Sequence, residues 1–149
     1  FPPLLITRAE IESRVESMVG NYIHGTELYW GHLHGRGVEA WRKDSQTLHF
    51  DLDLAKESWW FDPEVDIDFD LKILCSNGKI SLQIKNVKAD VDWDLLADIL
   101  TLSIIDLVSD KMAAKLTGSL KNLSYTNDTG LPICPNINVL ANGDIQFSL

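Results

Sequence analysis

The sequence predicts an α+β fold in which an antiparallel sheet packs on a long C-terminal helix, with a shorter N-terminal helix before the sheet. Two observations indicate the sheet: apolar and polar residues alternate over 48–54 and 65–73, and an Asn-Gly pair follows at 77–78. A wide apolar stripe after residue 92 indicates the helix. With 149 residues, the chain is expected to form a single domain, 1–149, that can bury a core.

Composition and charge exclude several classes of protein. Apolar residues make up 45% of the chain and charged residues 23%, which is typical of a globular domain and not of a disordered one. The formal net charge of −9 argues against nucleic acid and anionic membrane surfaces as partners. The most apolar run, LLADILTLSIIDLVS, contains Asp98 and Asp106 and is too short to span a bilayer, so no transmembrane segment is expected.

The first element is expected to be an amphipathic helix of about four turns that begins after Thr7. Thr7 and Glu10 have the spacing of a capping box, in which each side chain satisfies a backbone amide of the other residue. Gly20 and Gly25 mark its end. The apolar face has helical spacing: Ile11, Val15, Met18 and Tyr22.

Three segments then predict strands. Within residues 26–41 one strand face is shared by Leu28, Trp30, His32 and His34, but three glycines weaken the strand and suggest a bulge or sharp bend: Gly31, Gly35 and Gly37. Residues 48–54 and 65–73 alternate cleanly and read as half-buried antiparallel strands. Their inward side chains are expected to be Leu48, Phe50, Leu52, Leu54, Val65, Ile67, Phe69, Leu71 and Ile73.

The pair Asn77-Gly78 predicts a type I′ hairpin turn, because both positions require positive φ. Pairing about this turn places apolar residues opposite one another: Cys75 with Ile80, Ile73 with Leu82, and Leu71 with Ile84. The alternation then slips, since Ile84 and Val87 are both expected to face inward. One extra residue near Asn86, a β-bulge, would restore the register. On the other face, Asp70 then lies opposite Lys85 before the bulge, and Asp68 lies opposite Lys88 and Asp66 opposite Asp90 beyond it.

Between residues 61 and 70 a carboxylate occupies every second position: Asp62, Glu64, Asp66, Asp68 and Asp70. Such side chains lie about 7 Å apart and point away from the core. In water each neighbouring pair repels by only about 0.6 kcal/mol. Because calcium requires six to eight converging oxygens, we expect a solvated strand face and no metal site. A weak cation site is the alternative, at the group Glu64, Asp66, Asp90 and Asp92.

A long helix is expected from Asp92 to about Gly118, followed by a loop and two short strands about a second turn, Asn142-Gly143. The helix would be about 37 Å long, enough to cross a whole sheet. Its apolar stripe consists of Leu95, Leu96, Ile99, Leu102, Ile105, Val108, Met112 and Leu116.

The two cysteines, Cys75 and Cys134, are too few and too far apart for a zinc ribbon. We expect a disulfide formed in an oxidising compartment; two buried thiols are the alternative. Two glycosylation sequons, at Asn122 and Asn127, matter only in a source that glycosylates.

No sequence signature of catalysis is present: the chain has no nucleophile elbow, P-loop, HExxH or dinucleotide fingerprint. We therefore expect no enzyme and no cofactor. His32 and His34 share a strand face, and with His49 or Asp51 they could form a metal site, although such histidines are usually ordinary polar side chains. The adjacent Trp59 and Trp60 lie at a strand end, where one of them could face solvent or a ligand, or both could fill the core.

The order of elements resembles that of a known family. The phrases ITRAEIESRV, VDIDFDLKI, GKISLQIKNVKADVDWDLLADIL and INVLANGDIQFSL are similar in pattern to the YceB-like bacterial periplasmic lipoproteins, single-wing relatives of the tubular lipid-binding (TULIP) proteins. The resemblance implies a curved antiparallel sheet that wraps the long helix, with space between them for a lipid.

Together these expectations describe a non-catalytic, periplasmic or secreted domain that binds a lipid or other apolar ligand between the sheet and the long helix. The alternative is a structural or protein-interaction module with a solid core and no ligand. The sequence identifies neither the ligand nor a protein partner. The predicted ligand-binding residues are Phe50, Leu52, Val65, Ile67, Phe69, Leu82 and Ile84 on the sheet, and Leu95, Ile99, Leu102, Ile105, Val108 and Met112 on the helix.

Overall fold

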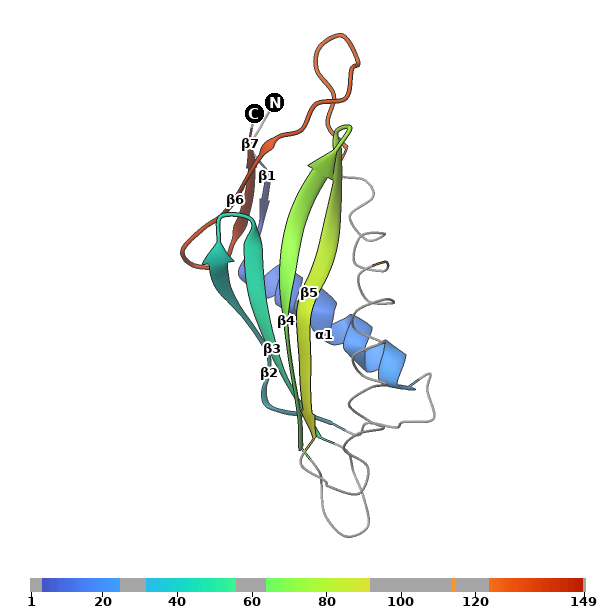
Figure 1. Ribbon diagram of the computed structural model, residues 1–149, viewed down its shortest axis with the longest axis vertical. Helices are drawn as coiled ribbons and strands as arrows, with labels where there is room; N and C mark the ends of the chain where they lie inside the picture. The colour runs from blue at the N-terminus through green and yellow to red at the C-terminus, as the bar shows by residue number, and fades with distance from the viewer. Residues whose placement is uncertain (1–3, 25–31, 56–63, 92–113, 115–123, 149) are drawn as a thin grey trace.

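The computed structural model describes residues 4–24, 32–55, 64–91, 114 and 124–148, and their strands form two antiparallel sheets (Figure 1). The larger sheet has the order β2-β3-β4-β5 and consists of β2 (His32–Asp44), β3 (Thr47–Ala55), β4 (Glu64–Ser76) and β5 (Lys79–Val91). The smaller sheet has the order β1-β7-β6 and consists of β1 (Leu4–Ile6), β6 (Asn136–Val139) and β7 (Ile145–Ser148). Helix α1 (Arg8–His24) follows β1.

The predicted fold, a single curved sheet packed on a long C-terminal helix, is wrong. The strands divide into two sheets, and the described residues contain one helical element, the N-terminal α1. The division arises because β1, a strand that the sequence analysis did not identify, pairs with β7, with Leu4 opposite Phe147. The C-terminal hairpin is therefore not a part of the larger sheet, although the Val139 amide donates to the Ser45 carbonyl at 2.8 Å between β2 and β3. The predicted helix 92–118 lies, apart from Ala114, outside the described residues.

Helix α1 begins where the capping box predicted. The Thr7 carbonyl accepts the first helical bond from the Ile11 amide (3.1 Å), and the Thr7 hydroxyl accepts a bond from the Glu10 amide (3.2 Å). The Arg8 amide is satisfied by Asp144, which lies just before β7, at 2.7 Å. The helix N-terminus is therefore tied to the smaller sheet, and Ile11 and Val15 are buried in the core.

The register of the larger sheet agrees with the sequence prediction. Asn77 has a φ of 50° and Gly78 a φ of 76°, as a type I′ turn requires. The predicted pairs of β4 and β5 are present: Cys75 with Ile80, Ile73 with Leu82, Leu71 with Ile84, Asp68 with Lys88, and Asp66 with Asp90. The second Asn-Gly turn, at 142–143, separates β6 from β7, as predicted.

Both predicted irregularities of the strands are also confirmed. The pairing of β2 with β3 shifts between Leu33 and Val38, the stretch that contains Gly35 and Gly37. The pairing of β4 with β5 shifts between Asp68 and Asp70, opposite Asn86, whose φ of 54° marks the bulge.

The core lies on the face of the larger sheet that α1 crosses (Figure 1), and we call this the inner face. Phe50 and Phe69, on neighbouring strands, stack there with ring centroids 5.2 Å apart. The smaller sheet adds to the same core. The buried apolar residues of the two sheets and α1 are Ile6, Ile11, Val15, Val38, Ala40, Leu48, Phe50, Leu52, Ile67, Phe69, Leu71, Ile73, Ile80, Leu82, Val139, Ile145 and Phe147.

The loop 124–135 is fastened to the β4–β5 turn. The predicted disulfide between Cys75 and Cys134 is confirmed, and the Tyr125 amide donates to the Gly78 carbonyl at 2.8 Å. A Cβ on Gly78 would lie 2.4 Å from the Tyr125 carbonyl oxygen, so this close approach requires glycine. Within the described part of the chain, no helix is long and apolar enough to cross a membrane.

Candidate functional site

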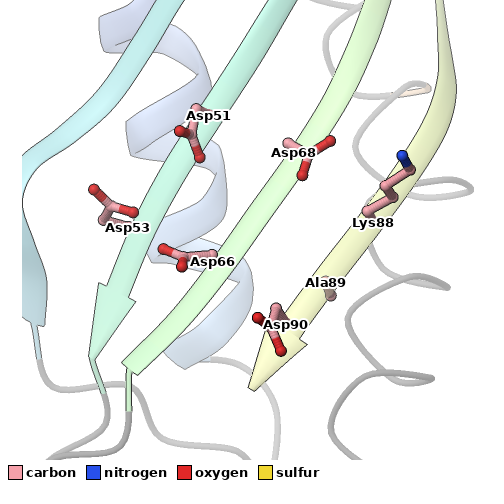
Figure 2. A pocket seen from close by; sticks show the side chains of 7 residues that line it. All are labelled: Asp51, Asp53, Asp66, Asp68, Lys88, Ala89 and Asp90. Atoms are coloured by element: carbon pink, nitrogen blue, oxygen red, sulfur yellow. The ribbon is translucent and has the colours of Figure 1, made fainter. Parts of the chain in front are cut away.

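The polar chemistry of the described residues is concentrated on the outer face of the larger sheet, opposite α1 (Figure 2). Side chains that face one another across antiparallel strands form rows over this surface. One row is Trp41, His49 and Asp70 on β2, β3 and β4, and the next is Glu39, Asp51, Asp68 and Lys88. A third row is Asp53, Asp66 and Asp90.

The second and third rows border an open hollow of about 530 Å³, which we call the acidic hollow. Its lining residues are Asp51, Asp53, Asp66, Asp68, Lys88, Ala89 and Asp90 (Figure 2). Asp66 and Asp68, on alternate positions of β4, therefore point outward, as predicted, and they meet further carboxylates from β3 and β5. Lys88 is the one cation among the residues that line this hollow.

Two of these carboxyl groups, Asp66 and Asp51, have a raised pKa. A hydrogen bond with Asp53, burial, and the charges of Asp53, Asp51 and Asp90 raise the pKa of Asp66 to about 6. Burial, followed by the charges of Asp53 and Asp68, raises the pKa of Asp51 above its ordinary value. In the part of the chain that the structure describes, no group of His, Cys, Asp and Glu side chains has an arrangement that could hold a metal ion.

Asp70 has a different environment from the other outward aspartates, because it is only 4% exposed. Its carboxylate accepts hydrogen bonds from Lys43 Nζ, from His49 Nδ1 at 2.7 Å and from Asn86 Nδ2 at 2.7 Å. Burial by itself raises the pKa of Asp70, but the bonds from Lys43, Asn86 and His49 outweigh burial and lower the pKa to about 2. We call Lys43, His49, Asp70 and Asn86 the Asp70 network.

The local fold explains how three donors converge on this carboxylate. His49 lies directly opposite Asp70 on β3, and Asn86 is the bulged residue of β5. A small hollow of about 210 Å³ lies over the network, and Asp68 and Lys88 complete its lining. On the other side of His49, the Trp41 ring lies 4.8 Å from the imidazole, centroid to centroid.

Sequence reasoning missed the Asp70 network. It placed Asp70 opposite Lys85, and this register is correct, but the carboxylate bonds to Lys43, His49 and Asn86 instead. Two signals could have found it: the predicted bulge near Asn86, and the single row that Trp41, His49 and Asp70 form.

Six of the seven ligand-binding residues predicted on the sheet are brought together in the core. Phe50, Leu52, Ile67, Phe69 and Leu82 are buried, and Ile84 is half-buried. Val65 belongs to β4. The residues predicted on the helix (Leu95, Ile99, Leu102, Ile105, Val108 and Met112) lie outside the described residues, as do Trp59, Trp60 and Trp93. His32 and His34 belong to β2.

Comparisons with protein-family models, with curated proteins and with solved structures find no match for this chain. The resemblance to the YceB-like lipoproteins therefore stays a prediction.

Proposed function

We propose that this chain is a non-catalytic extracytoplasmic binding module that holds the acyl chain of a lipid, or another apolar molecule of similar shape, on the inner face of its larger sheet. The observation that carries the proposal is the margin of this face along β5. There Ile84, Val87 and Ala89 pack against the core and yet are only half-buried. Apolar surface that continues from a core to an edge strand offers a route of entry for an apolar molecule.

The rest of the inner face suits the same ligand. Leu52, Ile67 and Phe69 are almost completely buried there, whereas the charged side chains of β3 and β4 occupy the outer face. A polar substrate would find no partner on such a surface, because a buried polar group without a hydrogen bond costs free energy. The resemblance to the YceB-like lipoproteins implies the same class of ligand.

The arrangement of the titratable groups supports binding rather than catalysis. His49 Nδ1 is bonded to Asp70, and His49 Nε2 lies 3.8 Å from Asp68. The bond to Asp70 fixes the imidazole, and the neighbour that the structure places near Nε2 is a carboxylate rather than the hydroxyl or thiol of a nucleophile. The disulfide supports an oxidising, extracytoplasmic compartment. We propose that this compartment is the periplasm or the extracellular space.

Titration with cis-parinaric acid, a fluorescent fatty acid, tests the proposal. We expect saturable fluorescence enhancement that oleate reverses. Ile84→Asn, which puts a polar group on the half-buried margin, should weaken binding at least tenfold. Lys85→Gln is the matched control, since it changes the next residue of the same strand without altering the apolar face, and it should bind like the wild type.

Two results would overturn the proposal. Absence of saturable binding would favour the structural or protein-interaction module with a solid core. Equal binding by wild type and Ile84→Asn, with far-UV circular dichroism unchanged, would place the fatty acid elsewhere.

A further inference from the structure

A second candidate for a binding surface lies on the outer face of the sheet, and it is independent of the apolar ligand proposed above. It combines the row of Trp41, His49 and Asp70 with the 210 Å³ hollow beside it. Trp41 is 43% exposed, although tryptophan is the largest apolar side chain. Its ring contacts the His49 imidazole, and the two ring planes are inclined by 44°. Part of the indole surface is therefore open to solvent next to His49, which is one of the residues that line the hollow.

The Asp70 network holds the polar atoms of this hollow in place. A buried carboxylate is costly unless it is fully hydrogen-bonded, so Asp70 keeps Lys43, His49 and Asn86 in one arrangement. Hydrogen-bonding capacity remains after these bonds are formed. An ammonium has three donor hydrogens, and the imidazole has a second nitrogen. Such preorganisation lowers the entropic cost of binding a ligand.

Because both acidic and basic side chains line the 210 Å³ hollow, its lining favours a neutral ligand. A phosphate or carboxylate would meet Asp68 and Asp70, and a cation would meet Lys43 and Lys88. A neutral molecule with several hydroxyl groups suits both, because each hydroxyl donates to a carboxylate and accepts from an ammonium. If it also has an apolar C–H face, that face can lie on the exposed indole. A sugar ring in its pyranose form has all of these properties.

We propose that Trp41, His49, Lys43, Asp68 and Lys88 form a subsite for a neutral pyranose sugar. In this arrangement the C–H face of the sugar contacts the Trp41 indole. Its hydroxyls bond to the Asp68 carboxylate, to the Lys43 and Lys88 ammonium groups, and to the imidazole. Asp70 is a positioning residue, since it lies beneath Lys43 and His49 and acts through them.

The experiment is an NMR titration of the ¹⁵N-labelled full chain with four probes: the methyl glycosides of glucose, galactose, mannose and N-acetylglucosamine. We expect saturable shifts of the Trp41 indole N–H signal, assigned by its loss in Trp41→Leu, for at least one glycoside. Lys88→Met, followed by the same signal, and Trp41→Leu, followed by the backbone amide signal of His49, should each weaken binding about tenfold, as expected for the loss of one charged hydrogen bond or one stacking contact. Asp90→Asn, on the same face but outside the small hollow, should bind like the wild type.

Three outcomes would overturn the proposal: no saturable shift with any of the four glycosides, shifts that are equally strong in Lys88→Met, or a stronger response of Trp41 to inorganic phosphate or to putrescine than to the sugars. The last outcome would show that the hollow selects a charged ligand. Far-UV circular dichroism identifies a variant that fails to fold, and Lys88, which is exposed, provides a variant in which the Asp70 network is unchanged.

Discussion

Asp53 and Asp66 lie directly opposite each other on β3 and β4, and their carboxyl groups share a hydrogen bond on the outer face of the sheet. Like charges at directly opposed positions destabilise a sheet. Two carboxyl groups can share a hydrogen bond only when one of them carries a proton. The free energy of unfolding should therefore depend on pH through this pair of carboxyl groups.

We predict that the free energy of unfolding rises when the pH is lowered from 7 to about 5. The pKa of Asp66 is about 6 in the folded protein and 3.8 ordinarily, so the folded state binds more protons than the unfolded state over this interval. Stability from this group is fully present below the ordinary pKa and is lost as the pH rises through 6. Urea unfolding at several pH values measures the effect. In Asp66→Asn the rise should be smaller, and a wild type whose stability falls between pH 7 and 5 would contradict the account.

Asp70 should contribute stability with the opposite dependence on pH. Its pKa is lowered to about 2, so its contribution is present above pH 3.8 and is lost as the pH falls through 2. At pH 7, Asp70→Asn should lower the free energy of unfolding by about 1–3 kcal/mol, because it removes charged hydrogen bonds from a buried site. Asp90→Asn, at an exposed position, should change it by less than about 0.5 kcal/mol. Equal losses of unfolding free energy in the two variants would show that the Asp70 network stabilises the fold no more than an exposed carboxylate does.

Two glycines with similar φ angles test the contact between the β4–β5 turn and the loop 124–135. Gly78 has a φ of 76° and Gly130 a φ of 81°, but a Cβ would meet the Tyr125 carbonyl at 2.4 Å only at Gly78, and nothing within 4 Å at Gly130. Gly130→Ala should therefore cost only the conformational penalty of about 1 kcal/mol. Gly78→Ala should cost at least about twice as much, since the loop must also move. Thermal unfolding of both variants makes the comparison. Equal losses of stability would show that the close contact between Gly78 and the Tyr125 carbonyl does not restrict this position.

The disulfide should stabilise the protein substantially, because Cys75 and Cys134 are 59 residues apart in sequence. In the chain-entropy model a closed loop of that length contributes about 4 kcal/mol. The double variant Cys75→Ser with Cys134→Ser should lose a large part of this in chemical denaturation. Thiol titration of the unreduced, denatured wild type should find no free thiol. Two reactive thiols would contradict both the pairing and the oxidising compartment.

The features that the sequence predicted correctly are local in the chain. The Asn77-Gly78 turn determines the register of β4 and β5, and the slip at Asn86 identifies the bulge, because each signal lies within a few residues of the structure that it specifies. The division into two sheets depends on β1 and β7, which pair Leu4 with Phe147 across almost the whole chain. Alternation shows which face of a strand is buried, but it does not show which sheet the strand joins.

The candidate sites were predictable to a similar extent. Alternation placed Asp66 and Asp68 on the outer face, and the bulged register brought Asp90 opposite Asp66. Alternation reveals the Asp70 network only in part. The slip near Asn86 predicts the bulge, but it does not predict the bond from the Asn86 amide to Asp70 or the reach of the long Lys43 side chain from β2.

The most direct test of the central claim, that the inner face holds an apolar molecule, is native mass spectrometry of the unreduced protein after secretion into an oxidising compartment. We expect a population whose mass exceeds that of the disulfide-bonded chain by one lipid or fatty acid, and organic extraction should release that molecule. The Ile84→Asn variant, purified in parallel, should carry less of it. A spectrum that contains only the mass of the bare chain, from protein secreted by a lipid-rich host, would contradict the claim.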